Sequence, residues 1–274
     1  MVETRHSRMI REISSFQNDW VKRVKLLQEK NRARRKEGVF IVEGLNEIRL
    51  CIAGGYKIVE FAFCPDLISI ETLNQKIGAN VLDFSRVYSL SGAIFDSLAY
   101  RGGVENAIAL VAYPTSRNSI EDIDSEGLFF VAESVEKPGN LGAILRTADA
   151  SRMSALIVCD ELVDIFHPNV IRNSLGCVFT VPIILCSSEQ AIETFNRKKI
   201  CIFSTFMEES ISVFNANLTG GVALVVGTEH QGLSDVWRGK GQNINIPMLG
   251  QVDSLNVSVA SAVLMYEATR QRLN

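Results

Sequence analysis

Residues 136–150 read EKPGNLGAILRTADA, and this stretch decides the fold. The apolar run at 128–132 precedes it and has the length of a buried parallel strand. A Pro-Gly turn follows, and a helix is predicted over residues 140–151. Gly139 permits a turn with positive φ, while Gly142 lets another backbone segment come close. The stretch therefore predicts a strand, a tight turn and a helix, which is the repeating unit of parallel α/β sheets.

The rest of the second half alternates strands and helices in the same way. Its apolar runs are short and are separated by turn residues, as in sheets that are buried on both faces. We expect strands at 155–159, 181–185, 200–205, 222–226 and 244–246, and helices at 168–175 and 254–272. The pattern indicates an α/β domain with a parallel sheet.

The first half opens with a basic helical segment. Trp20, Val24 and Leu27 lie at i, i+4 and i+7, so one helix with an apolar face is predicted over residues 18–36. We expect strands at 39–42, 58–64, 81–84 and 107–112, and helices at 43–53 and 71–77. Alternating elements predict a three-layer α/β sandwich. The polar stretch 113–127 predicts a linker that separates domains 1–112 and 128–274.

Charge is distributed unevenly along the chain. The net charge of the 274 residues is −3, but residues 1–36 carry eleven Lys or Arg against four Asp or Glu. A basic segment attached to an acidic body is typical of proteins that bind a phosphate-rich partner such as RNA. The alternative interpretation is that the segment is a solvated helix without a partner. The candidate RNA contacts are Lys22, Lys25, Arg32, Arg34 and Arg35.

Composition excludes several classes of protein. The chain is 47% apolar and 22% charged, as in globular enzymes. It has no apolar run of the length that spans a membrane, and its first residues lack the apolar core of a secretory signal. The six cysteines form no C-x-x-C pair, and the three histidines are too scattered to complete a zinc site. We expect reduced cysteines, no metal, no membrane and a cytoplasmic protein.

A second cluster, LVVGTEHQGLS, occupies residues 224–234. An apolar strand runs into Gly227, and a glycine at a strand end permits a ligand close to the backbone. The carboxylate of Glu229 suits a cationic ligand there, although it can instead cap the next helix. His230 is more typical of the surface than of a catalytic base.

A third cluster, INIPMLGQVDSLNVSVASAVLMYE, occupies residues 244–267. A short strand leads through Pro and Gly into a helix, for which Asp253 or Ser254 is the expected N-cap. Small residues recur at helical spacing in this helix and predict close packing on that face. Close packing does not account for the polar Ser254 and Asn256 beside an apolar loop.

Gly139, Gly142 and Asp160 allow a competing interpretation as a nicotinamide-binding enzyme. A glycine turn after one strand and an acidic residue at the end of the next are typical of dinucleotide-binding units. The turn here reads G-x-x-G, however, and lacks the G-x-G-x-x-G spacing that lets backbone approach a pyrophosphate.

Taken in order, the three clusters resemble the SpoU (TrmH-like) family of RNA 2′-O-ribose methyltransferases, in the SPOUT superfamily. The matching residues are Asn140, Gly142 and Arg146, then Gly227, Glu229 and Gly232, then Ile246, Pro247, Met248, Gly250, Ser254, Leu255, Asn256, Val257, Ser258 and Ala260. The match covers nearly all of 128–270, and His230 with Gln231 is its one departure. The N-terminal ISSFQNDWVK and FIVEG are similar to the family's ribosomal-protein-like RNA-binding domain.

The resemblance implies a C-terminal domain with a parallel sheet and a trefoil knot, which holds S-adenosylmethionine. It also implies a homodimer whose site is completed across the interface, and methyl transfer to a ribose 2′-hydroxyl, with ribosomal RNA favoured over transfer RNA. It assigns catalysis to Arg146, Asn140, Glu229, Ser254 and Asn256. It assigns cofactor binding to Gly227, Thr228, Ile246, Met248 and Leu255.

The role of Arg146 stays open at this point. The family's proposed base is the arginine of this motif, but arginine side chains remain protonated in proteins. A charged Arg146 would instead hold a phosphate or stabilise the developing alkoxide. A non-catalytic RNA-binding or ribosome-assembly protein of the same fold is a further alternative.

Overall fold

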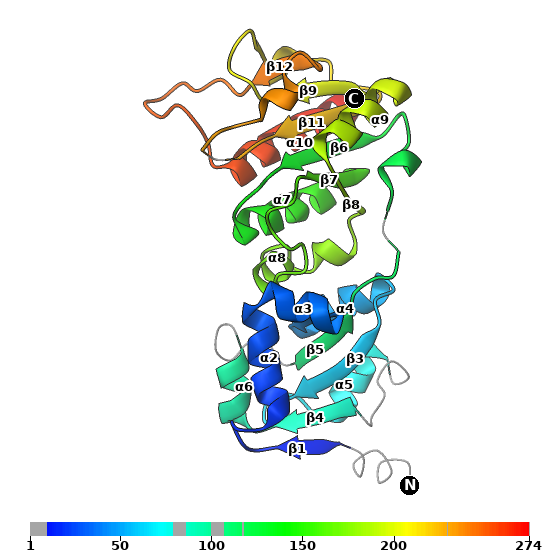
Figure 1. Cartoon of the computed structure of the whole chain (residues 1–274), viewed down its shortest axis with the longest axis vertical. Coiled ribbons are helices and arrows are strands. Elements are labelled where there is room, and N and C mark those ends of the chain that lie inside the picture. Colours follow the sequence, from blue (N-terminus) through cyan, green and yellow to red (C-terminus); the bar gives the residue numbers. More distant parts are fainter. Residues whose placement is uncertain (1–9, 79–85, 100–106, 117, 229, 274) are drawn as a thin grey trace. The chain divides into compact units, whose positions relative to one another are not determined.

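The computed structural model in Figure 1 describes residues 10–78, 86–99, 107–116, 118–228 and 230–273. The chain divides into two compact units. Unit 1 comprises Met1–Thr115 and Phe166–Thr180, and unit 2 comprises Ser116–Ile165 and Val181–Asn274. Unit 1 is therefore discontinuous in sequence, a feature that the polar stretch 113–127 gave no reason to predict.

Unit 1 is an α/β sandwich around a mixed sheet. Its described strands are β1 (Arg11–Ile13), β2 (Val39–Glu43), β3 (Ile58–Phe63), β4 (Val87–Leu90) and β5 (Ala107–Ala112). Its described helices are α2 (Asp19–Glu29), α3 (Asn31–Glu37), α4 (Leu45–Ala53), α5 (Ile70–Ile77), α6 (Gly92–Leu98), α8 (Pro168–Asn173) and the 3-10 helix η3 (Cys177–Phe179). The strand order is β1-β4-β3-β5-β2, and β5 runs antiparallel to both of its neighbours.

Side chains of β2 alternate between the two faces of the sheet, as the strand period requires. Ile41 joins the apolar cluster formed with α2 and α6. Phe40 lies on the other face and stacks on Phe166, with ring centroids 4.3 Å apart. Helices therefore cover both faces, as the predicted three-layer sandwich requires. Burial raises the pKa of the Cys51 thiol in α4 to about 12, consistent with an inert core cysteine.

Several predicted elements of unit 1 differ in the structure. The single helix predicted over 18–36 is wrong, because Lys30 adopts an extended conformation (φ −113°, ψ 109°) between α2 and α3. The short elements β1, β4 and α6 were not predicted. The strand predicted at 81–84 lies outside the described residues.

Unit 2 is built on a parallel sheet. Its described strands are β6 (Leu128–Glu133), β7 (Ala155–Cys159), β8 (Ile183–Cys186), β9 (Cys201–Ser204), β10 (Ile211–Ser212), β11 (Val222–Val226) and β12 (Gln242–Asn245). Its described helices are α7 (Pro138–Ala150), α9 (Ser188–Lys198), α10 (Val257–Arg272) and the 3-10 helices η2 (Ile120–Asp122), η4 (Val213–Asn215) and η5 (Asp235–Trp237). The strand order is β10-β12-β9-β11-β6-β7-β8, and each neighbouring pair is parallel.

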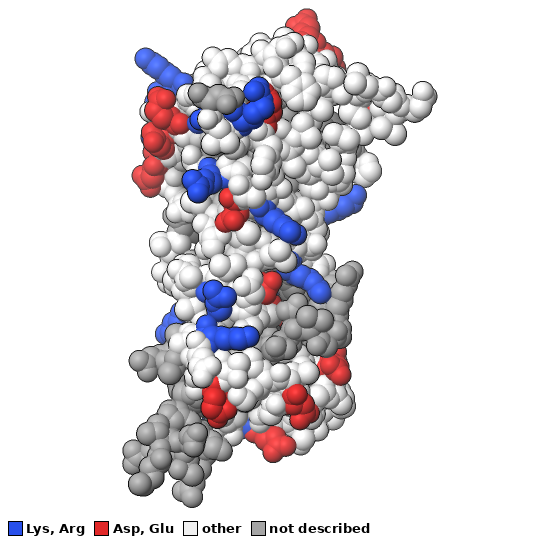
Figure 2. Space-filling model, turned by 180° about the vertical axis from the view of Figure 1, so that it is seen from behind, with Lys and Arg blue, Asp and Glu red and all other residues white. Residues whose placement is uncertain are grey.

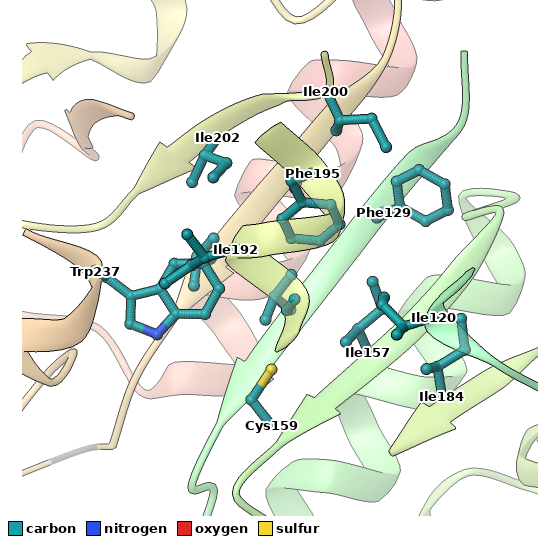
Figure 3. Packing of buried hydrophobic residues seen from close by; sticks show 14 of the residues in the cluster. Ile120, Phe129, Ile157, Cys159, Ile184, Ile192, Phe195, Ile200, Ile202 and Trp237 are labelled. Atoms are coloured by element: carbon teal, nitrogen blue, oxygen red, sulfur yellow. The ribbon is translucent and has the colours of Figure 1, made fainter. Parts of the chain in front are cut away.

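The core of unit 2 lies between the sheet and α9. Ile192 and Phe195 of α9 pack against the sheet, where Phe129 stacks on Phe195 at a centroid distance of 6.3 Å (Figure 3). Trp237 from η5 belongs to the same buried cluster. On α7 and α10, Ser151 lies within hydrogen-bond distance of the Met265 sulfur at 3.6 Å, so these two helices pack together. The parallel α/β architecture predicted for this half is confirmed.

The last helix of unit 2 begins later than predicted, and one helix of this unit was missed. Helix α10 begins at Val257, and its N-cap is Asn256 instead of Asp253 or Ser254, because the Asn256 side chain accepts a hydrogen bond from the Ser258 amide at 3.0 Å. Helix α9 was not predicted.

The predicted linker at 113–127 is also partly ordered. It contains η2, and its two isoleucines, Ile120 and Ile123, are buried in the core of unit 2. The trefoil knot implied by the family resemblance stays a prediction. In the part of the chain that the structure describes, every helix is too short or too polar to cross a membrane.

Candidate functional site

Three strands of unit 2 bring the three sequence clusters to one edge. The clusters follow β6, β11 and β12, and the carboxyl ends of parallel strands lie at the same edge of a sheet. The chain proceeds from β6 to β7 and β8 on one side, whereas β11, β9 and β12 lie on the other. Strand order thus reverses between β6 and β11, and ligands in open α/β sheets bind at such a switch point.

The first cluster forms the start of α7. Pro138 occupies the first turn, where its fixed φ suits a helix, and Leu141 and Leu145 are buried. Asn140 is half-buried, and Arg146 is exposed to solvent. Within the described residues Arg146 forms no hydrogen bond or ion pair, so its guanidinium remains available to a substrate.

The second cluster folds back on itself after β11. The Thr228 amide donates to the Gly232 carbonyl at 3.0 Å, and the Gly232 amide donates to the Thr228 carbonyl at 3.2 Å. Gly227 is buried beneath this turn, and a Cβ at its position would lie 2.1 Å from the Gly232 oxygen. Glycine is therefore required at 227. Glu229, a predicted catalytic residue, lies outside the described residues, and His230 is exposed.

The third cluster is the loop between β12 and α10, drawn in orange to red at the left of Figure 1. Ile246 and Met248 are half-buried, and Leu255 is 37% exposed. The exposed Ser254 hydroxyl lies 3.1 Å from an Asp253 carboxylate oxygen, to which it donates. The apolar side chains of this loop are therefore only partly packed against the core, and part of their surface is free to contact a ligand.

Asn256 connects the third cluster to the first. Its Oδ1 caps α10 by accepting from the Ser258 amide and hydroxyl at 3.0 and 2.6 Å. Its Nδ2 donates to Asn140 Oδ1 at 3.4 Å, across 116 positions of sequence. Two predicted catalytic residues are thus brought together. In the described part of the chain no hydrogen bond joins Arg146 to Ser254 or Asn256.

The predicted RNA contacts lie on α2 and α3 of unit 1, and four of them are exposed. Lys25 lies over the ring of Phe16 at 5.9 Å, and Arg35 over Tyr113 at 5.5 Å. Arg34 is 0% exposed and donates to the carbonyls of Leu27 and Gln28. The proposal of Arg34 as an RNA contact is therefore corrected: a fully buried side chain that caps α2 does not reach a ligand.

Family comparison agrees with this arrangement. Residues 127–266 match the model described as the SpoU rRNA Methylase family. The chain belongs to the SpoU rRNA methylase family. Residues 18–109 match a second model, the MRM3-like substrate binding domain. The SpoU match contains the first two clusters and all but the last residue of the third, and the second match contains α2 and α3.

Similar proteins cover most of this SpoU member. The 23S rRNA (guanosine-2′-O-)-methyltransferase RlmB of Vibrio parahaemolyticus is 34% identical over 194 residues, which cover 68% of this chain and 78% of that protein. The crystal structure of an RNA 2′-O ribose methyltransferase has a TM-score of 0.84 and 33% identity, covering 96% of this chain and 100% of the other. The crystal structure of the AdoMet-bound rRNA methyltransferase from Sinorhizobium meliloti has a TM-score of 0.82 and 27% identity. The match covers 97% of this chain and 100% of the other.

Sequence reasoning missed two residues at the carboxyl edge of this SpoU sheet. Glu133 ends β6 and is buried, and its signal was an acidic residue closing the apolar run LFFVAE. Ser204 ends β9, which lies between β11 and β12. Its buried hydroxyl has no hydrogen-bond partner within the described residues. No sequence signal distinguished Ser204 from an ordinary strand residue.

The structure does not support the nicotinamide interpretation, because Asp160, its acidic residue, already has partners within the protein. Asp160 accepts from the Ser188 amide at 3.1 Å and from its hydroxyl at 2.7 Å, so this carboxylate already fixes the start of α9. Among the described residues, no group of three or more His, Cys, Asp or Glu side chains is placed to hold a metal ion.

Proposed function

We propose that this chain methylates a ribose 2′-hydroxyl in ribosomal RNA. Membership in the SpoU family makes it an S-adenosylmethionine-dependent RNA 2′-O-methyltransferase. The observation that carries the proposal is the meeting of the three clusters at one sheet edge, where Asn256 contacts Asn140. The names of RlmB and of the Sinorhizobium enzyme support ribosomal RNA as the substrate class.

The residues at this edge suit the cofactor. Gly227 and Thr228 present backbone at the end of β11, while Ile246, Met248 and Leu255 keep apolar surface exposed for an adenine. The buried, unpartnered hydroxyl of Ser204 at the end of β9 is also consistent with a missing polar ligand. When bound, S-adenosylmethionine supplies the sulfonium methyl group.

Arg146 acts on the ribose in this proposal. The attacking hydroxyl must give up its proton, here to water, and it becomes more negative as it takes the methyl group and leaves S-adenosylhomocysteine. Because an arginine remains protonated, we assign Arg146 to stabilising that charge and the neighbouring phosphate. Asn140, Ser254 and Asn256 orient the ribose or Arg146, and Glu229 is retained as a candidate on the family resemblance alone.

Methyl incorporation tests the proposal. Unmodified ribosomal RNA transcribed in vitro is incubated with labelled S-adenosylmethionine and the protein. We expect labelled 2′-O-methylnucleosides, with Arg146→Ala near background. Incorporation into transfer RNA transcripts alone would support the tRNA alternative. Equal background with wild type and Arg146→Ala would support a non-catalytic RNA-binding protein.

The proposal includes a homodimer formed through α10. Val259 and Tyr266 are exposed, and Val263 is half-buried, at the i, i+4 and i+7 spacing of one helix face. An apolar face of this kind is consistent with a second copy of the chain as its partner. Sedimentation should show a dimer that Val259→Asp with Tyr266→Asp dissociates. Leu162→Asp, an exposed apolar residue elsewhere in unit 2, is the matched control.

A dimer whose two copies complete one site predicts loss of methyl transfer on dissociation. A monomeric wild type, or a dissociated variant with full activity, would contradict this part of the proposal. We also propose a cytoplasmic location, because none of the six cysteines, all of them described, forms a disulfide.

A further inference from the structure

Glu133 is a buried charged residue that the proposed chemistry does not use. It is the last residue of β6 and is 4% exposed, in a strand whose other five residues are apolar. Burying a carboxylate is unfavourable unless hydrogen bonds replace the lost water. The partners of Glu133 therefore indicate why an acidic residue occupies this position.

Three donors converge on the Glu133 carboxylate, and one further hydroxyl lies close to it. Oε2 accepts from the Ser234 amide at 2.9 Å. Oε1 accepts from the Ser234 hydroxyl at 2.6 Å and from the Trp237 indole Nε1 at 3.0 Å. The Ser188 hydroxyl lies 3.0 Å from Oε1. The Ser188 hydroxyl donates instead to Asp160, at 2.7 Å. All three donors to Glu133 belong to the segment that follows β11, so this network holds that segment to β6.

That segment includes the predicted cofactor loop. Strands β6 and β11 pair with Ala132 opposite Val226, so Glu133 and Gly227 end neighbouring strands side by side. The turn above Gly227 is closed by the paired hydrogen bonds between Thr228 and Gly232. Ser234 comes two residues after Gly232. The start of the loop is therefore closed by its own backbone hydrogen bonds, and its end is held by hydrogen bonds to Glu133.

Trp237 makes the second attachment rigid. Its ring is fully buried among the residues of the α9 cluster, and Figure 3 shows it beside Ile192. A buried indole N–H needs an acceptor, and Glu133 provides it. The position of η5, and with it the end of the loop, is thus defined by packing and by a charge-assisted hydrogen bond together.

We propose that Glu133 is a positioning residue that holds the loop after β11 in the shape that binds S-adenosylmethionine. This inference rests on the proposed function, since it requires that Gly227 and Thr228 contact the cofactor. Glu133 acts through the loop and does not itself touch the substrate. Its loss is therefore expected to weaken cofactor binding more than it slows the methyl-transfer step.

Glu133→Gln is the direct test. The amide group of Gln replaces one acceptor with a donor, which then faces the Ser234 amide or the Trp237 indole. Loss of a buried hydrogen bond to a charged group predicts a rise of about 10-fold to 100-fold in the Kd for S-adenosylhomocysteine measured by calorimetry. KM for S-adenosylmethionine should rise in parallel, with kcat changed less than about threefold.

Glu267→Gln is the matched control. Glu267 is also buried, at 7% exposure, and accepts from Arg270 and Gln271 near the end of α10, without contacting the loop. We expect it to lower thermal stability but leave the Kd for S-adenosylhomocysteine unchanged. In a Trp20→Phe background, the emission of Trp237 should shift with Glu133→Gln and stay unchanged with Glu267→Gln.

Three outcomes overturn the inference. If folded Glu133→Gln binds S-adenosylhomocysteine as wild type does, the inference fails and the proposed function stands. If wild type fails to bind S-adenosylhomocysteine, both fail. Should Glu133→Gln not fold, Ser234→Ala with Trp237→Phe removes two side-chain donors from the same network while keeping an aromatic side chain at position 237. An unchanged Kd in that folded variant would overturn the inference equally.

Discussion

Arg146 projects from α7 as an exposed side chain without an internal partner among the described residues. Replacing it with Ala therefore removes no packing, and we expect unchanged thermal stability and unchanged S-adenosylhomocysteine binding. Loss of a charge-stabilising donor predicts a fall of about 10²-fold to 10³-fold in kcat. Single-turnover methyl transfer at saturating cofactor measures this value. Arg146→Ala with activity within a few fold of wild type would remove Arg146 from the mechanism.

Asn256 has two functions that two substitutions separate. Asp retains the side-chain acceptor that caps α10 but loses the donor to Asn140, whereas Ala loses both. We expect Asn256→Asp to keep wild-type thermal stability and lose methyl transfer. Asn256→Ala should also lose about 1 kcal/mol of unfolding free energy. Denaturant titration and methyl-transfer assays measure the two effects, and a fully active Asn256→Asp would show that the contact with Asn140 is dispensable.

At the residue scale, prediction from sequence succeeded where chemistry was local. The amides of Asn140 and Asn256 were singled out separately, and the fold brings them within 3.4 Å. Arg34 was misassigned because charge was weighed without position: the break at Lys30 places its side chain in the interior, where it donates to the Leu27 and Gln28 carbonyls. Glu133 was missed because its role depends on Ser234, which is about a hundred positions away in sequence. The two residues come together because β6 pairs with β11 in the sheet.

At the element scale, the loop after β11 depends on a close backbone approach at Gly227. A Cβ there would lie 2.1 Å from the Gly232 oxygen, so Gly227→Ala must displace the turn. We expect a loss of about 1–3 kcal/mol in unfolding free energy, and a Kd for S-adenosylhomocysteine raised about tenfold. Gly92→Ala in α6 is the control, since its added Cβ meets its nearest atom at 3.5 Å. Wild-type affinity in Gly227→Ala would argue against this loop as a cofactor contact.

Elements with a strong local pattern were predicted well. Strands β7 and β11 have the predicted bounds, because each is one apolar run between turns. Helix α9 was missed although its signal was present: Ser187 and Gln190 form a capping box at its start. The break at Lys30 had no such signal, since neither proline nor glycine occurs there.

At the scale of the whole molecule, order along the chain did not predict which segments belong together. Phe166–Thr180 lies between β7 and β8 in sequence but belongs to unit 1, where Phe166 stacks on Phe40. A stacking partner 126 positions away leaves no trace in local periodicity. The same limit applies to charge: the sequence predicted a basic segment, whereas Figure 2 shows Lys and Arg side chains in separate groups on the face drawn, some of them beside Asp or Glu.

Whether the exposed Lys and Arg side chains of α2 and α3 bind RNA is therefore tested by the salt dependence of binding, which reports the number of phosphate contacts. Neutralising Lys22, Lys25, Arg32 and Arg35 to Gln should weaken RNA binding and flatten its salt dependence. Each lost phosphate contact lowers the slope of log K against log salt by about 0.7 to 0.9. Arg34 is left intact because its removal would unfold the segment. Anisotropy of a labelled ribosomal RNA fragment across a salt series gives the slope.

Lys199→Gln with Lys240→Gln, both exposed in unit 2 and outside the three clusters, provides the control for a general loss of positive charge. A change in the slope of log K against log salt that is confined to the α2 and α3 variant would identify those helices as the RNA surface. Nonspecific attraction depends on total charge and would change the slope in both variants. An unchanged slope in the α2 and α3 variant would mean that its four side chains are solvated surface. RNA affinity would then have to come from other parts of the chain.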